Sequence, residues 1–218
     1  MSTEEDCIQR VKSILVSEAA VKIDFYVGPI HVDFPGFATV LAWIGAKQVG
    51  NPGIGFEFGT VPPGAAAAYD NDDDVFRFPD TNYGGTPAQR AVIIHESVHA
   101  MRDIWGATID TPSGPKETTD TMDEAAAYIA ESLFRLYEKT PGKGDWLTEG
   151  LRVKADAIAK SIMNVKGAVV SDHDVDTMQD LVASNRVYRN MGVTRKTPSL
   201  ANGMKPRPTY FWSSRLHD

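Results

Sequence analysis

Apolar residues repeat at two different periods along this chain, and the change between the periods marks its expected elements. Over residues 4–20 they recur every three to four positions, which is typical of an amphipathic helix. Over residues 21–34 they alternate with polar residues, which predicts one or two half-buried strands. A short apolar helix is expected at about residues 37–48, and the glycines and prolines of residues 49–65 predict an irregular loop.

Helical periodicity dominates the second half of the chain. Before it, two short runs at residues 66–69 and 75–78 flank an acidic cluster, which predicts a hairpin with that cluster at its tip. The helices expected after this hairpin cover residues 86–105, 121–139, 145–163 and 172–190. A small β-sheet packed on a mainly helical core makes α+β the expected fold class. We expect one domain over residues 1–190 and an extended C-terminal tail over residues 191–218, where prolines recur.

Charge narrows the range of partners. The 218 residues include 22 basic and 29 acidic side chains, and the net charge of -7 argues against nucleic acid or an anionic membrane as the main partner. The longest apolar run, residues 34–46, is too short for membrane insertion, and the acidic N-terminus does not resemble a secretory signal. We therefore expect a protein that is cytoplasmic as made, with export by a route without a cleaved signal as the alternative. No oligomeric state is predicted.

One motif inside the expected helix 86–105 carries chemistry: His95-Glu96-Ser97-Val98-His99. Two histidines four residues apart on a helix differ by about 40° in direction, so both imidazoles can reach one metal ion. Glu96 points about 100° away from His95, where a base for a water at the ion would sit. The flanking residues are uncharged, so the helix is expected to be buried, and a buried glutamate without a function would be costly. The alternative is two partly buried histidines beside a surface glutamate.

A third protein ligand is expected from the next helix, because a zinc site needs at least three. That helix offers four carboxylates: Asp120, Asp123, Glu124 and Glu131. Glu124 is the first candidate, because it precedes the alanines at 125–127, whose small side chains allow two helices to approach closely. However, Thr121-x-x-Glu124 is also a capping box, which would engage the same carboxylate at the helix start. Asp123 and Asp120 therefore stay open as alternatives.

Cys7 is the single cysteine of the chain. It excludes a disulfide within the chain and a cysteine-rich structural zinc site. A metal would then be held by histidine and carboxylate, the set that is typical of catalytic zinc.

The segment Ile94–Ala100, followed by Asp123–Tyr128, resembles the zincin metallopeptidases, specifically the gluzincin arrangement with a downstream glutamate ligand. Arg102 and Trp105 exclude the HExxHxxGxxH subclass, and Asp123 replaces the asparagine that precedes the ligand glutamate in the better-known gluzincin pattern. The resemblance implies a single zincin-like catalytic domain in which Val75–Phe78 is an edge strand that pairs with an extended peptide. A weaker likeness is to the HExxH domains of bacterial toxins and secreted effectors.

The resemblance implies a zinc-dependent metallopeptidase that acts on a peptide or protein substrate. Zinc would be held by His95, His99 and Glu124, and Glu96 would be the general base. Tyr128 and His173 are the candidates for a second donor to the developing oxyanion. The alternatives are a non-proteolytic zincin-like domain that binds metal or a partner, and a peptidase-type toxin or effector.

The acidic cluster offers a competing site. Asp70, Asp72 and Asp74 have the spacing of the first ligands of an EF-hand calcium loop. However, Val75 replaces the expected glycine and Thr81 stands where the closing glutamate would fall. A solvated hairpin tip is therefore favoured over a calcium site.

Overall fold

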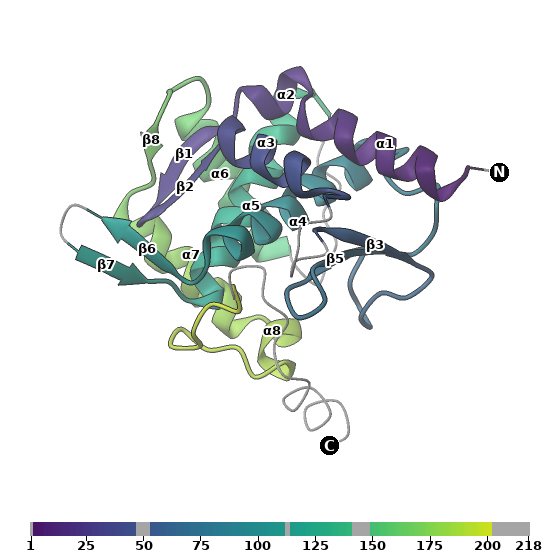
Figure 1. Ribbon diagram of the computed structural model, residues 1–218. Helices are drawn as coiled ribbons and strands as arrows, with labels where there is room; N and C mark the ends of the chain where they lie inside the picture. Colours follow the sequence, from purple (N-terminus) through teal and green to yellow (C-terminus); the bar gives the residue numbers. More distant parts are fainter. Residues whose placement is uncertain (1, 47–52, 112–113, 141–148, 202–218) are drawn as a thin grey trace.

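The computed structural model describes residues 2–46, 53–111, 114–140 and 149–201, and it has the predicted α+β architecture (Figure 1). The helices are α1 (Glu4–Leu15), α2 (Glu18–Val21), α3 (Phe34–Trp43), α4 (Pro87–Trp105), α5 (Asp120–Tyr137), α6 (Glu149–Ile162), α7 (Asp172–Ser184) and α8 (Arg186–Asn190). The strands are β1 (Asp24–Val27), β2 (Ile30–Asp33), β3 (Gly55–Phe58), β4 (Ala68–Asp70), β5 (Val75–Phe78), β6 (Thr108–Thr111), β7 (Gly114–Glu117) and β8 (Ala168–Val169). Residues 145–148 of an expected helix and 202–218 of the expected tail lie outside the described residues.

The N-terminal part contains the helices α1, α2 and α3, which pack on one another, and a small sheet of order β2-β1-β8, whose strand β2 contacts α3. The alternating residues 21–34 form the antiparallel pair β1 and β2, as predicted. The helix expected over residues 4–20 is in fact two helices, because the side chain of Ser17 accepts a hydrogen bond from the amide of Ala20 and starts α2. The short strand β8, parallel to β1, had no recognisable alternation in the sequence.

The second sheet has the order β3-β5-β4 and contains the predicted hairpin of β4 and β5. The prediction that Val75–Phe78 is an edge strand is wrong, because β3 pairs in parallel with its other side. Residues 49–65 were expected to be an irregular loop, but they contain the strand β3. The glycines around β3 gave a loop signal in the sequence. The edge strand next to the HExxH helix is β4 instead. Among the strands that the structure describes, β4 pairs with β5 alone, through its residues 68–70.

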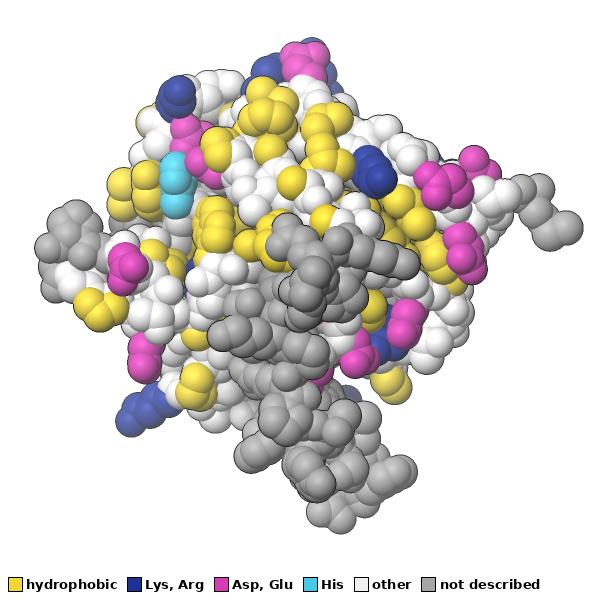
Figure 2. All heavy atoms as spheres, viewed as in Figure 1, with side chains coloured by type: hydrophobic (Ala, Val, Ile, Leu, Met, Phe, Trp, Pro, Cys, Tyr) yellow, Lys and Arg dark blue, Asp and Glu magenta, His cyan; other side chains and the backbone are white. Residues whose placement is uncertain are grey.

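The helices α4 and α5 form the centre of the molecule, and α6 and α7 pack on α5. Side chains of Ala125, Ala126 and Ala127 are fully buried, which allows the close helix packing that they predict. The hairpin of β6 and β7 connects α4 to α5. Among the described helices, none has the length and apolar character needed to cross a bilayer. Figure 2 shows acidic and basic side chains interspersed over the described part of one face.

Residues 191–201, the described part of the expected tail, lie against the start of α5. Pro198 forms an antiparallel bridge with Thr119, which precedes α5. The amide of Asp120 donates to the carbonyl of Thr197 at 3.1 Å, and the amide of Ser199 donates to the carbonyl of Thr118 at 3.1 Å. This segment is thus held by regular backbone hydrogen bonds.

The hairpin of β4 and β5 is fixed to α4 by a buried acidic contact. The acidic cluster was expected to be solvated, but Asp74 is 1% exposed, and its φ of 55° turns it inward. Asp103, at the end of α4, is fully buried beside it and accepts a hydrogen bond from the hydroxyl of Tyr69 at 3.1 Å. Burial and the neighbouring Asp103 raise the pKa of Asp74 from its ordinary value to about 7.

We predict that Asp74→Asn changes the pH dependence of stability. Because the pKa of Asp74 is raised in the folded state, its contribution is fully present below about pH 4 and is lost as the pH rises through about 7. Asparagine does not ionise, so thermal unfolding should show the variant gaining about 4 °C or more over the wild type between pH 4 and pH 8.5. Asp73→Asn is the control, because the Asp73 side chain is 58% exposed. Parallel pH curves for Asp74→Asn and the wild type would contradict the prediction.

Candidate metal centre

The helix α4 presents both histidines of the motif on one side. It begins at a capping box, in which Thr86 and Gln89 each accept a hydrogen bond from the backbone amide of the other. It ends before Gly106, whose φ of 78° stops the helix. His95 and His99 lie one turn apart with ring centroids 5.1 Å from each other. Both imidazoles therefore face the same region of space.

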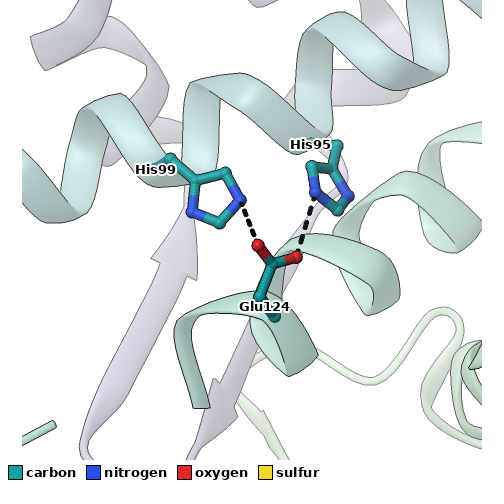
Figure 3. Close-up of side chains that lie close together, drawn as sticks. All are labelled: His95, His99 and Glu124. Atoms are coloured by element: carbon teal, nitrogen blue, oxygen red, sulfur yellow. Dashed lines mark ion pairs between the residues drawn. The ribbon is translucent and has the colours of Figure 1, made fainter. Parts of the chain in front are cut away.

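The helix α5 brings Glu124 between these two rings (Figure 3). Glu124 Oε2 lies 3.4 Å from His95 Nε2, and Glu124 Oε1 lies 3.6 Å from His99 Nε2. Two ligands that share one zinc ion in tetrahedral geometry lie about 3.3 Å apart, so the spacing fits a common ion. In the part of the chain that the structure describes, these three residues form a cluster that could hold a metal ion.

The capping box that competed for Glu124 does not form. The helix begins one residue earlier than expected, so Thr119 is the N-cap and Thr121 lies inside the first turn. The hydroxyl of Thr121 pairs with that of Thr119 at 3.1 Å, which leaves the carboxylate of Glu124 directed at the histidines.

The two alternative ligands have other partners. Asp123 receives a hydrogen bond from Arg102 Nε at 3.1 Å and another from the hydroxyl of Ser199. Asp120 Oδ1 accepts from the amide of Leu200 at 2.9 Å. Asp123 and Asp120 thus anchor the chain around the cluster, and of these three acidic residues Glu124 is the one that reaches both histidines.

Opposite charges balance within the cluster. Burial by itself lowers the pKa of His95, but the carboxylates of Glu124 and Glu131 outweigh it and raise the pKa to about 10. Burial by itself raises the pKa of Glu124, but His99 and His95 outweigh it and lower the pKa to about 2. The pocket therefore favours positive charge between these side chains, as a site for a divalent cation requires.

Glu131 contacts His95 from the side opposite Glu124, a contact that the sequence did not reveal. His95 Nδ1 faces Glu131 Oε2 at 3.4 Å, on the ring edge opposite Glu124, and Arg152 on α6 donates to Glu131 Oε1. A carboxylate on the second nitrogen of a metal-binding histidine fixes the orientation and tautomer of the ring. Glu131 follows Glu124 by seven residues, two turns along the same helix face, so this spacing was a usable signal.

Glu96 lies beside the cluster and is not part of it. Its side chain is 8% exposed, and its Oε2 accepts a hydrogen bond from the backbone amide of Tyr69 on β4 at 2.8 Å. Burial raises the pKa of Glu96 above its ordinary value, although His95 and His99 oppose the shift. A carboxylate with a raised pKa is a better proton acceptor near neutral pH.

His95, Glu96, His99, Glu124 and Glu131 all line one cavity of about 330 Å³. Residues 62–72 form one wall, and the other walls come from α4, α5, Arg152, α8 and the segment after it. Tyr128 lines the cavity, with its ring 4.7 Å from that of His95 in an edge-on contact. His173 does not line it, because α7 begins at Asp172 and carries His173 exposed in its first turn. Of the two candidate oxyanion donors, only Tyr128 thus lies at this site.

Comparisons with protein families, curated proteins and solved structures find no match to this chain. The resemblance to gluzincins therefore depends on the two sequence motifs alone.

Proposed function

We propose that this protein is a zinc-dependent metallopeptidase. The observation that carries the proposal is the convergence of His95, His99 and Glu124 within the reach of one ion, with Glu96 in the same cavity. Two imidazoles and one carboxylate match the ligand set of catalytic zinc, which keeps a fourth position for water or substrate. Zinc bound there would lower the pKa of a water and polarise a substrate carbonyl.

Glu96 has the properties that the proposed general base needs. It is buried in the cavity, it has a raised pKa, and the amide of Tyr69 holds one of its oxygens. In the proposed reaction it accepts a proton from the attacking water and passes that proton to the leaving amine. Hydrolysis of a peptide bond requires both transfers, and one carboxylate within reach of both atoms can perform them.

The edge strand β4 supports an extended peptide as the substrate. Residues 65–70 line the cavity, and among the described strands β4 pairs with β5 alone. A peptide that added to its other side would have to replace the contact between the amide of Tyr69 and Glu96, and backbone pairing of this kind is independent of side-chain sequence. Tyr128 lines the same cavity and is the candidate donor to the carbonyl oxygen, but its hydroxyl lies 3.0 Å from that of Tyr188, so it would have to leave that contact to reach the substrate.

We predict that the purified protein binds one zinc ion and that His99→Ala weakens this binding by more than about 100-fold. Loss of a ligand should exceed the 10- to 100-fold effects of losing its outer partners. Metal analysis after purification without chelators, followed by titration against a competing chelator, measures both values. His31→Ala is the matched control, because His31 pairs with Asp24 on the β1–β2 hairpin, outside the cluster. Protein without zinc, or equal affinity of His99→Ala and the wild type, would refute the proposed site.

We also predict that Glu96→Gln keeps zinc and lowers the rate of cleavage of an unfolded protein by about 10²- to 10⁴-fold. Glutamine preserves the shape of the side chain but accepts no proton. The measurement is cleavage of unfolded casein at saturating zinc, with Glu117→Gln on the exposed surface of β7 as the control. Wild-type activity in Glu96→Gln would remove the assigned base. Bound zinc without any cleavage by the wild type would favour the non-proteolytic alternative.

A further inference from the structure

Tyr188 on α8 contacts the third ligand of the cluster, although it lies 64 residues further along the chain. Its hydroxyl donates to Glu124 Oε2 at 2.7 Å, the shortest contact that Glu124 makes among those described above. The hydroxyl of Tyr128 lies 3.0 Å from that of Tyr188. The three groups form a chain in which Tyr128 donates to Tyr188 and Tyr188 donates to the carboxylate.

This contact matters because nothing within the glutamate side chain fixes the plane of its carboxylate. The terminal torsion of glutamate is broad and nearly two-fold, so rotation of the carboxylate costs little by itself. In this cluster Oε1 faces His99 and Oε2 faces His95. A hydrogen bond that holds Oε2 therefore sets the direction of both oxygens at once.

We propose that Tyr188 is a positioning residue of the metal centre, which holds the carboxylate of Glu124 in the orientation that binds the ion. The proposal rests on the proposed metal site. Partners that orient the ligands of metal ions are worth about 10- to 100-fold in metal affinity. Tyr188 is a positioning residue and not a proton donor to substrate, because its O–H is already directed at Glu124.

A tyrosine hydroxyl is a suitable partner at this position, because it is a neutral donor. It costs less to bury than a further cation beside His95 and His99.

Hydrogen bonds fix the backbone around Tyr188, so its hydroxyl is held in place beside the carboxylate of Glu124. The side chain of Asn185 caps α8 through the amide of Val187, and the amide of Val193 donates to the carbonyl of Tyr188 at 3.0 Å. Arg195 then pairs with Asp180 on α7 at 3.0 Å. The chain continues to Ser199, whose hydroxyl donates to Asp123, the neighbour of Glu124. The segment 185–199 thus holds two consecutive acidic residues of α5.

The test compares Tyr188→Phe with the wild type in zinc titrations against a competing chelator. We expect Tyr188→Phe to bind zinc about 10- to 100-fold more weakly and to give a changed visible spectrum when cobalt(II) replaces zinc. Tyr137→Phe is the matched control, because its hydroxyl accepts a hydrogen bond from the amide of Asn164, away from the cluster. Circular dichroism and thermal unfolding establish that each variant is folded. Affinity of Tyr188→Phe within about twofold of the wild type would overturn the proposal.

A second comparison shows whether Tyr188 acts through Glu124. In a Glu124→Ala background the hydroxyl has no carboxylate to hold, so Tyr188→Phe should cause no further loss of affinity. An equal loss in both backgrounds would mean that Tyr188 acts elsewhere, and it would overturn the positioning role while leaving the metal site intact. A wild-type protein that binds neither zinc nor cobalt would overturn the metal centre, and the positioning role with it.

Discussion

The placement of one carboxylate, Glu124, between two imidazoles is the interaction on which the rest of this structure depends. Burying a charge is costly unless an opposite charge and hydrogen bonds accompany it. Glu124 receives both, because His95 and His99 face its two oxygens and Tyr188 donates to one of them. The contact requires α4 and α5 to approach closely, and the alanines that follow Glu124 make that approach possible.

The acidic residues around the cluster are also paired with hydrogen-bond donors or positive charges. Glu131 lies between His95 and Arg152, so the positive ring edge meets a carboxylate and that carboxylate meets a guanidinium. Asp123 lies between Arg102 and Ser199 in the same way. In a low-dielectric interior such networks stabilise a structure when their members are paired, and they penalise the loss of any one member. Through the Asp123 network, α4 and the segment that carries Ser199 both contact the first turn of α5.

Local patterns predicted the parts of this arrangement that depend on local physics. The helix α4 and its histidine pair follow from residues within a few positions of one another. The third ligand was harder to predict, because Thr121-x-x-Glu124 fits a capping box equally well. The choice depended on the helix starting at Asp120. Tyr188 could not be predicted, because no periodicity relates α8 to α5 across 64 residues. The strand β3 was missed because its pairing with β5 is a long-range contact, whereas its glycines are a local signal for a loop.

Tyr69 on β4 connects the hairpin of β4 and β5 to two acidic residues of α4, Glu96 and Asp103. The backbone amide of Tyr69 donates to Glu96, and its hydroxyl donates to Asp103, which lies seven residues later on the same helix. One residue of the edge strand thus spans two turns of α4 and is fixed at both ends. A peptide that added beside β4, by replacing the contact of the Tyr69 amide with Glu96, would be aligned with the strand and would lie next to Glu96. Backbone hydrogen bonds would then set the position of the scissile bond relative to Glu96, the proposed base. This arrangement fits the proposed recognition of an extended chain rather than of particular side chains.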